Sequence, residues 1–367
     1  MYKRLLIILG LMIFLAGCDY DTNQVEEVNT VQTQLRDKYI KGGLIPTGVL
    51  DFSYQTNSKI TSSPAVYNDF VVFASQDGSI YKVNTITGKM AWNTPKKLPE
   101  KIEDASVDID DNKIFIGTKS GSMYALDFYS GNILWQFKTD DAILSTVLFT
   151  KNYMFFGSTD GNAYCLTTKD GQLRFKYSLG SPIQAPITIF HKNLYIADYN
   201  GFLSLYREMD ATPLWRFKAT SPLTTKPIAT QSTVFVGSSD KVFYAVDAAT
   251  GKLRWKKTLS GLLKSTPVLH NSNIYIGDAN GYIRSLSVDT GVQNWAFKTK
   301  GAILASPALV NDILYVASGD GFIYAIKPQT GMLVWKFGVM SPIFSSPVVN
   351  NGKVYFGANN GKFYSVK

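Results

Sequence analysis

The stretch AVDAATGKLRW, residues 245–255, decides the fold. A short apolar segment leads into a Thr-Gly turn, and Trp255 follows four residues after Gly251. Gly suits a tight turn because it tolerates positive φ, and a flat indole ring suits the gap between two packed sheets. The same order recurs as Gly48/Phe52, Gly88/Trp92, Gly131/Trp135, Gly171/Phe175, Ala211/Trp215, Gly291/Trp295 and Gly331/Trp335.

Every Trp of the chain occupies this one position of the pattern. Successive pairs lie 40 residues apart, except for a spacing of 43 between the second and third pairs. A phase shared by all six Trp indicates an internal repeat that covers residues 44–367. We predict that eight aromatic residues fill the gaps between repeats: Phe52, Trp92, Trp135, Phe175, Trp215, Trp255, Trp295 and Trp335.

A second landmark recurs in step with the aromatic residues. It is a turn in which Asp, Asn or Ser precedes a Gly, and such turns favour tight hairpins. Short strand patterns flank each turn, and Ser-Pro or Thr-Pro opens a further strand at Pro64, Pro267, Pro307 and Pro347. Each repeat therefore holds four short strands. The second residue of the turn is Gly78, Gly121, Gly161, Gly201, Lys241, Gly281, Gly321 or Gly361.

Four-stranded repeats of this length predict an all-β fold, an eight-bladed β-propeller. An open solenoid is the alternative, but it needs atypical capping repeats, and none is visible in the sequence. The next Thr-Gly after Gly331 would fall at position 371, yet the chain ends at Lys367 with three strands of the last repeat. The orphan strand around residues 47–52 supplies the fourth. We therefore predict that the N-terminal strand completes the last blade and closes the ring.

The N-terminus has the pattern of an export signal. Lys3 and Arg4 precede an apolar run over residues 5–16, which is too short to span a membrane. The run ends in Leu-Ala-Gly-Cys at residues 15–18, which resembles the lipobox of bacterial lipoproteins. That resemblance implies cleavage before Cys18, lipidation of its sulfur and acylation of its amine. An ordinary signal peptide with a chance Cys is the alternative.

These patterns divide the chain into a signal peptide (1–17), a lipidated Cys with a flexible tether (18–43) and the propeller (44–367). The lipid anchor predicts a protein held at a membrane of the cell envelope and facing the periplasm. Asp19 follows the lipidated Cys. In enteric-type sorting an Asp at this position is associated with the inner membrane, so both membranes remain open at this stage.

Composition excludes several classes of protein. The chain is 45% hydrophobic and 13% aromatic, which is too apolar for a disordered protein. Its formal charge of +9 falls to +7 once residues 1–17 are removed, and it has no long Lys/Arg run. We expect no nucleic-acid partner.

The stretch at residues 245–255 resembles the tryptophan-docking motif of pyrroloquinoline-quinone-type propellers, and residues 125–135 and 325–335 are close variants. A lipobox followed by eight such repeats resembles the BamB family of accessory lipoproteins of the outer-membrane β-barrel assembly machine. That resemblance implies a monomeric, non-enzymatic scaffold without a cofactor. It also implies an outer-membrane location and binding to periplasmic domains of the central barrel-forming subunit.

The resemblance also implies a docking loop. Better-known members carry a Leu-Ser-Leu-Arg run before a Ser-Ala-Pro strand start, and the nearest counterpart here is LGSPIQAP at residues 179–186. The Ala-Pro is present and the Leu-Ser-Leu-Arg run is absent. We take Ser181, Pro182 and Gln184 as candidate partner contacts.

Two further functions stay open at the sequence level. One is a quinone-dependent dehydrogenase, which shares the propeller type but often carries a Cys pair, calcium ligands and an Asp base. The other is a lipid-anchored sensor or ligand-binding protein. The chain has Cys165 as its one Cys beyond Cys18, at a docking-motif position filled elsewhere by Ala, so a buried core residue is expected.

The other polar candidates fit turns better than catalysis or metal binding. His191 and His270 fall near turns, and Asp77, Asp160 and Asp320 occupy turn positions that favour Asp. Asp240-Lys241 breaks the turn rule, and we read it as a relaxed turn. We therefore predict no catalytic and no metal-binding residues.

The spacing of 43 places three extra residues after Trp92. Two Pro and six ionisable residues in segment 94–104 predict a solvated, partly stiff loop. It is either a tolerated surface insertion or a partner-contact loop with Lys96, Lys97 and Lys101 as candidate contacts. Lysines also recur three residues after the blade Trp, which predicts one partly basic end of the ring: Lys138, Lys218 and Lys298.

Overall fold

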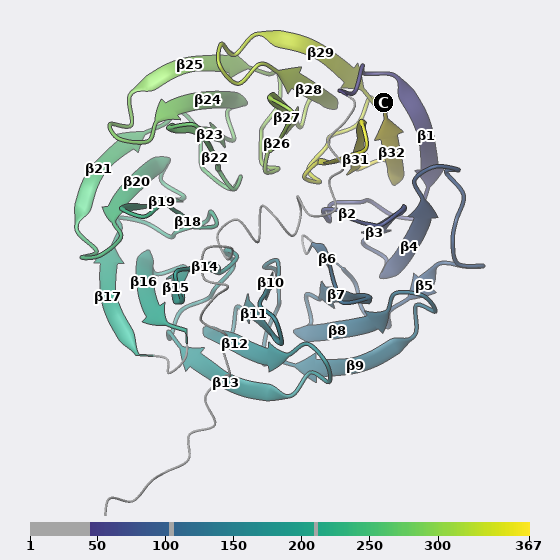
Figure 1. Ribbon diagram of the computed structural model, residues 1–367, viewed down its shortest axis with the longest axis horizontal. Helices are drawn as coiled ribbons and strands as arrows, with labels where there is room; N and C mark the ends of the chain where they lie inside the picture. Colours follow the sequence, from purple (N-terminus) through teal and green to yellow (C-terminus); the bar gives the residue numbers. More distant parts are fainter. Residues whose placement is uncertain (1–44, 103–105, 209–211) are drawn as a thin grey trace, which may run out of the picture.

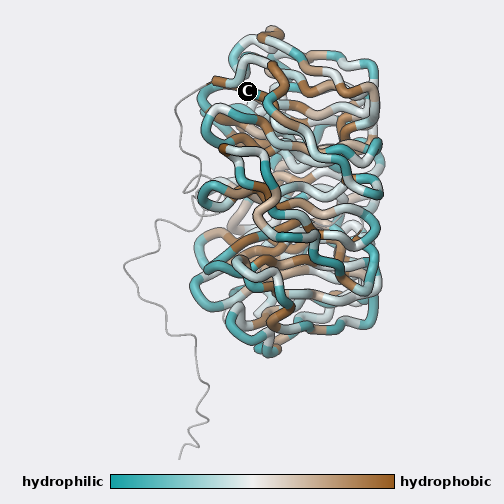
Figure 2. The backbone as a smooth tube through the Cα atoms, turned by 90° about the vertical axis from the view of Figure 1, so that its right-hand side faces the viewer, coloured by the Kyte–Doolittle hydropathy of each residue, from teal (hydrophilic) through white to brown (hydrophobic). Residues whose placement is uncertain are grey.

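A computed structural model describes residues 45–102, 106–208 and 212–367. These residues form 32 strands, grouped into eight four-stranded antiparallel sheets that stand as blades around a ring (Figure 1). The predicted eight-bladed β-propeller is confirmed. Viewed from the side, the ring is one thick layer with strands running through it and turns on both faces (Figure 2).

Four blades are built from the first half of the chain. From the centre outward they are β2 (Ala65–Tyr67), β3 (Phe70–Ala74), β4 (Ser79–Asn84) and β5 (Lys96–Lys97); β6 (Val107–Asp110), β7 (Lys113–Gly117), β8 (Ser122–Asp127) and β9 (Ile133–Lys138); β10 (Leu148–Phe149), β11 (Tyr153–Gly157), β12 (Asn162–Thr167) and β13 (Leu173–Ser178); and β14 (Thr188–Phe190), β15 (Asn193–Ala197), β16 (Phe202–Arg207) and β17 (Pro213–Lys218).

The second half of the chain supplies the other four blades. They are β18 (Ile228–Ala229), β19 (Thr233–Gly237), β20 (Val242–Asp247) and β21 (Leu253–Thr258); β22 (Val268–His270), β23 (Asn273–Gly277), β24 (Tyr282–Ser287) and β25 (Gln293–Lys298); β26 (Ala308–Val310), β27 (Ile313–Ala317), β28 (Phe322–Ile326) and β29 (Leu333–Gly338); and β30 (Val348–Asn350), β31 (Lys353–Gly357), β32 (Lys362–Val366) and β1 (Leu50–Gln55).

The last blade joins the two ends of the chain. Its strand order is β1-β32-β31-β30, with β1 antiparallel to β32 (Figure 1). Val49 and Lys367 exchange two backbone hydrogen bonds of 2.8 Å each. The predicted completion of this blade by the N-terminal strand is therefore confirmed, and β32 is not left as an unpaired edge.

Burial follows the position of each strand in its blade. The second and third strands are almost wholly buried, as in β27 and β28, because blades cover them on both sides. The outermost strands, such as β29, alternate between exposed and half-buried residues because only one side meets the ring. Separate clusters of buried apolar side chains between neighbouring blades form the core, as in the set Ala305, Tyr315, Ile323, Ile343, Val354 and Phe356.

Small residues face the aromatic residue in several blades, whereas Trp215 faces Leu205. Ala245 lies opposite Trp255, Ala325 lies opposite Trp335, and Cys165 lies opposite Phe175. A register shift follows directly after each of these pairs, so the outer strand bends there. The small side chain leaves room for the bend and for the ring.

The aromatic rings lie against turns of the following blade. A Cβ on Gly251 would come within 2.8 Å of the Trp215 ring, and one on Gly291 within 2.7 Å of the Trp255 ring. Gly88 stands in the same relation to Phe52, and Gly48 to Trp335, across the closing junction. Ala211, the counterpart for Phe175, lies outside the described residues. These positions need Gly because of both the close approach and the positive φ.

Most of the indole N–H groups also bond to the following blade. The donor–acceptor distances to backbone oxygens are 2.6–3.1 Å for Trp92 to Tyr129, Trp215 to Ala248, Trp255 to Val288, Trp295 to Pro328 and Trp335 to Pro46. The buried Nε1 of Trp135 has no hydrogen-bond partner among the residues described here. Each bond satisfies a buried donor and orients one blade against the next.

Replacing Trp255 with Ala should destabilise the protein by about 3–5 kcal/mol, because the gap between two blades cannot collapse. Trp255→Phe is the matched control. The Phe side chain still fills most of the gap between the blades, as Phe52 and Phe175 do at their junctions, but it cannot donate the hydrogen bond to Val288. This variant should therefore lose about 1 kcal/mol of unfolding free energy. Denaturant unfolding measures both values. A loss below about 1 kcal/mol for the Ala variant would show that the ring does not hold the blades together.

Candidate interaction face

One face of the ring gathers the predicted partner loops. Each connection that leaves an outer strand donates its backbone N–H to the carbonyl at the Gly position of its own blade's turn, as Leu98 does to Gly78, Leu179 to Gly161 and Leu259 to Lys241. The turns centred on these positions and the connections after the outer strands therefore lie together. We call this surface the turn face.

Carboxylates on the turn face are bound by their own blades. In the turn of the third blade, Asp160 accepts the backbone N–H of Asn162 at 2.9 Å and the hydroxyl of Tyr164 at 2.6 Å. Asp320 repeats this arrangement with Phe322 and Tyr324 at 3.1 and 2.8 Å. These contacts explain the Asp residues as turn and blade ties, which supports the interpretation from sequence.

Two blades replace this arrangement with a buried carboxylate that the sequence reasoning missed. Asp278 is fully buried and accepts hydrogen bonds from Ser260 at 2.6 Å and Arg284 at 2.5 Å. Burial disfavours its charged form, but the bonds from Ser260, the Tyr282 N–H and Arg284 outweigh that cost and lower its pKa. The sequence does contain a signal for this pair, because Asp278 stands where several other repeats have Ser, and Arg284 stands where most have Tyr.

Asp198 is the second such residue. It is fully buried, accepts the Phe202 N–H at 2.9 Å, and lies 3.6 Å from the guanidinium of Arg216. Among the residues that the structure describes, its Oδ2 finds no hydrogen-bond partner, and burial raises its pKa above the usual value for Asp. The weaker partner geometry explains why its pKa moves in the opposite direction from that of Asp278.

The insertion after Trp92 supplies a carboxylate to the second blade. The turn there has Ser120 in place of Asp or Asn. Glu100 from the insertion accepts the hydroxyls of Thr118 at 2.6 Å, Ser122 at 2.8 Å and Tyr124 at 3.0 Å, and also that of Ser120. Burial opposes ionisation of Glu100, but these hydroxyls outweigh it and lower its pKa to about 2.

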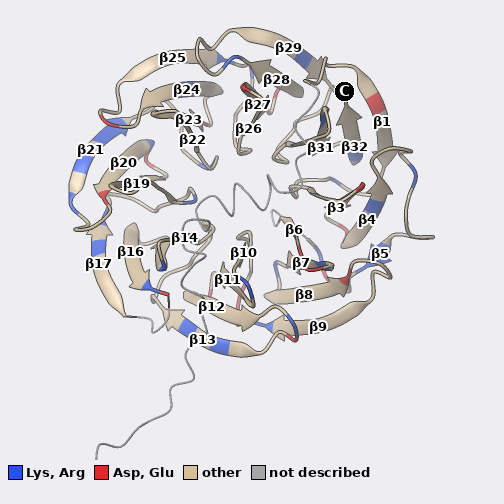
Figure 3. Ribbon diagram, viewed as in Figure 1, with Lys and Arg blue, Asp and Glu red and all other residues tan. Residues whose placement is uncertain are grey.

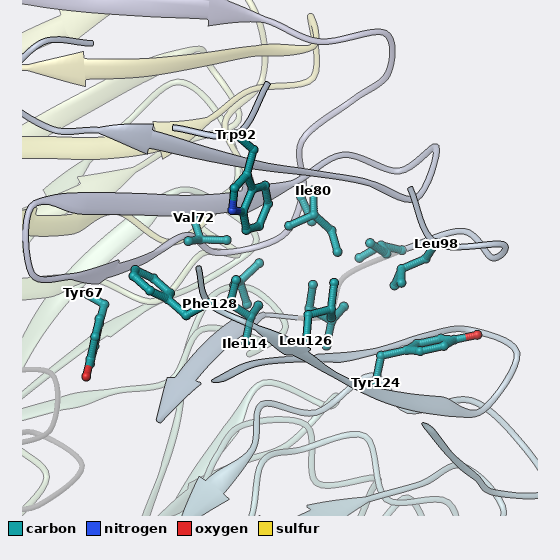
Figure 4. Close-up of a cluster of buried hydrophobic side chains, with 13 residues drawn as sticks. Tyr67, Val72, Ile80, Trp92, Leu98, Ile114, Tyr124, Leu126 and Phe128 are labelled. Atoms are coloured by element: carbon teal, nitrogen blue, oxygen red, sulfur yellow. The ribbon is translucent and has the colours of Figure 1, made fainter. Parts of the chain in front are cut away.

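The expectation of a solvated loop is wrong for the middle of this segment. Leu98 and Ile102 are 2% and 1% exposed and join the cluster between the first two blades. Figure 4 shows Leu98 pointing toward this cluster beside Ile80 and Leu126. Two apolar anchors flank Glu100, so the insertion is fastened to the second blade. Residues 103–105 lie outside the described part of the chain.

The three lysines of the insertion differ in their surroundings. The stem of Lys96 is half-buried over Gly131, beside the ring of Trp92. Lys97 is exposed, pairs with the Asp77 carboxylate at 3.3 Å and donates to the Asp77 carbonyl. Lys101 is exposed. The accessible candidates for a partner are therefore Lys97 and Lys101.

The recurring lysines lie at the turn face, as expected. Lys138, Lys218 and Lys298 are exposed and donate to the carbonyls of Ser120, Asn200 and Asn280, which precede the turn Gly of the same blade. Figure 3 shows Lys and Arg residues on several outer strands, among them β13, β17 and β21. Each lysine ties an outer strand to its turn while leaving positive charge at the rim.

The second candidate loop is partly closed to partners. Ser181 is 2% exposed, and its hydroxyl accepts the N–H of Asn200 at 2.8 Å. Pro182 is half-buried, and its carbonyl accepts the N–H of Tyr199 at 2.9 Å. Gln184 is exposed. The surface of this loop therefore consists of Pro182 and Gln184 with the half-exposed Tyr199 beside them.

The remaining sequence candidates lie in different blades. Cys165 is a buried thiol. His191 is exposed, and His270 lies 3.4 Å from Asp312 in the next blade. Across residues 45–102, 106–208 and 212–367, no three His, Cys, Asp or Glu side chains are grouped so that they could hold a metal ion. The same residues contain no helix that could span a membrane.

A family profile matches nearly the whole propeller. The profile described as outer membrane protein assembly factor BamB matches residues 44–142, 124–225 and 200–367. The chain belongs to this family. No curated protein sequence matches the chain.

Solved structures that resemble the chain share its fold. The designed protein Ika8 has a TM-score of 0.76 at 19% identity, covering 88% of this chain and 99% of its own. BamB from Moraxella catarrhalis has a TM-score of 0.72 at 18% identity, covering 86% and 96%. Sqt1 from Saccharomyces cerevisiae has a TM-score of 0.74 at 14% identity, covering 88% and 99%. These identities support the fold, whereas membership of the family rests on the profile.

Glu100→Gln should lower the melting temperature at pH 7, because a neutral amide replaces the carboxylate that four hydroxyls bind. The folded-state pKa of about 2 lies below the usual value of Glu, so the carboxylate stabilises the fold above about pH 4.5. This contribution disappears as the pH falls through about 2. The gap between the two proteins should therefore shrink in acid. A gap that is unchanged from pH 7 to pH 2 would contradict the role of Glu100.

The turn at Lys241 is not relaxed, contrary to the interpretation from sequence. Lys241 has a φ of 73°, close to the 74–88° of the Gly residues at the same position in the other blades. The turn thus forces a side-chain-bearing residue into the left-handed region. Lys241→Gly should stabilise the protein by about 1 kcal/mol.

Lys252→Gly is the control for this substitution. Lys252 is also exposed but lies outside the left-handed region, so Gly there should destabilise the protein. Denaturant unfolding would measure both changes. Equal destabilisation by the two variants would show that Lys241 is not under backbone strain.

Proposed function

We propose that the protein is a non-enzymatic, lipid-anchored scaffold that aids the assembly and insertion of β-barrel proteins into the outer membrane. The observation that carries this proposal is the match of the BamB family profile along residues 44–367. The description of the family names outer-membrane protein assembly, and we extend that role to this chain.

The chemistry of the turn face supports a scaffold. Asp160, Asp278 and Glu100 accept hydrogen bonds from their own or neighbouring strands, so none is poised as a free base. Accessible groups such as Lys97, Lys101 and Gln184 are suited to polar contacts with another protein. Rigid blades that present short loops favour binding without reorganisation.

The partner we propose is the set of periplasmic domains of the central barrel-forming subunit. Two loops are candidates for the contact: the insertion around Lys97 and Lys101, and the connection with Pro182 and Gln184. Cys18 would carry the lipid that holds the protein at the periplasmic side of the outer membrane. The signal peptide (1–17), Cys18, Asp19 and the tether (18–43) lie outside the described residues, so this part of the proposal rests on the lipobox.

Affinity capture of the full-length protein from crosslinked envelopes tests the assembly role. We expect the central barrel-assembly subunit among the captured proteins and reduced levels of outer-membrane β-barrel proteins in a deletion strain. A double variant with Lys97→Glu and Lys101→Glu should weaken capture, whereas Lys252→Glu, on the opposite side of the blades, should not. Capture of no assembly subunit, with normal β-barrel levels in the deletion strain, would refute the role.

A second experiment addresses the dehydrogenase alternative. Reconstitution with pyrroloquinoline quinone and calcium, followed by dye-linked alcohol or aldose oxidation, should give no activity above the protein-free control. Turnover that depends on both additions would replace the scaffold with a quinoprotein enzyme.

A further inference from the structure

Exposed apolar side chains gather at the place where the described chain begins. Six of them lie on two adjoining segments, with 42–62% of each residue exposed: Ile45, Val49, Leu50, Met332, Leu333 and Val334. The segments touch, because Pro46 accepts the indole N–H of Trp335 and Gly48 lies against the same ring. They therefore form one surface, which we call the apolar rim.

The rim stands out against the opposite side of the ring. At the repeat position two residues before the blade aromatic, Leu333 and Leu173 are exposed to 44% and 47%. Leu333 has Met332 and Val334 as exposed neighbours, whereas Leu173 is flanked by Gln172 and Arg174. Single exposed apolar residues are ordinary on a protein surface, but a cluster indicates a contact.

Charge around the rim has one dominant sign. Lys327, Lys336 and Lys367 are exposed on or beside the same segments. Asp51, an acidic residue on the same segment as Val49 and Leu50, is paired with Lys353 at 2.6 Å and with Lys367 at 3.3 Å. Apolar side chains with lysines at their margin are suited to an anionic lipid surface, where chains insert at the headgroup boundary and ammonium groups meet phosphates.

The position of Ile45, where the described residues begin, indicates that the rim faces the membrane. Ile45 belongs to the rim and lies 27 residues after Cys18, the proposed site of lipidation. A random-coil chain of that length would span about 26–31 Å r.m.s., so an anchor at Cys18 would hold this part of the ring nearest to the bilayer. We propose that the apolar rim rests on the surface of the membrane. This inference depends on the proposed lipid anchor and not on the assembly role.

Site-specific fluorescence tests the proposal. Leu333→Cys and, as the matched control, Leu173→Cys would each be labelled with an environment-sensitive dye in the full-length lipidated protein. Cys165 is buried, so the introduced Cys is the reactive site. The labelled proteins are reconstituted on vesicles of phosphatidylethanolamine and phosphatidylglycerol. We expect a blue shift at position 333 and quenching by nitroxide-labelled lipid, with neither change at position 173.

Three outcomes would overturn the proposal. One is identical emission and quenching at the two positions. Another is shielding of position 333 only when the protein is captured with partner proteins, without quenching by nitroxide lipid, which would assign the rim to a protein. The third is strong quenching at 333 that persists after Met332→Glu and Val334→Glu are introduced together. Membrane fractionation and intact-mass measurement report lipidation separately, so loss of the anchor is distinguishable from failure of the rim contact.

Discussion

Pairing between strands from the two ends of the chain is the constraint on which the ring depends. The blades pack side by side, so an open row of eight blades would leave two uncovered blade faces. β1 joins β32 through a full antiparallel ladder, and the bonds between Val49 and Lys367 extend it. Lys327 and Met332 make a similar bond of 2.9 Å inside a continuous repeat. The closing junction thus reproduces the geometry of an ordinary one.

At most junctions between blades, an aromatic ring of one blade packs against a Gly in a turn of the next blade. The ring of Trp255 occupies the space left by the missing side chain of Gly291 and lies opposite the small side chain of Ala245. The hydrogen bonds of the carboxylates at the turn face, in contrast, differ from blade to blade. Asp160, Asp278 and Glu100 bring a carboxylate to the same region of a blade from three different sequence positions. The scaffold is therefore regular in its apolar junctions and variable at its polar face.

The regular part could be predicted from the sequence, because every Trp marks the same phase and the missing strand follows from the spacing. The polar part could not be predicted in the same way. Glu100 compensates for Ser120 in the next blade, and this relation becomes visible only when the two are brought together. The charges of segment 94–104 predict a solvated loop, although Leu98 and Ile102 pack into the core between the first two blades. Partner contacts depend on which loop residues stay exposed, and a motif does not report that exposure.

Native-state hydrogen exchange of β1 is the most direct test of ring closure by the N-terminal strand. Segment 49–55, which contains β1, and segment 332–338, which contains β29, occupy the same position in their blades, and each strand is paired with one inner neighbour. If the N-terminal strand closes the ring, their hydrogen-bonded amides should exchange at similar, slow rates that reflect opening of the whole ring. Fast exchange confined to β1, with β29 protected, would contradict closure of the ring by the N-terminal strand.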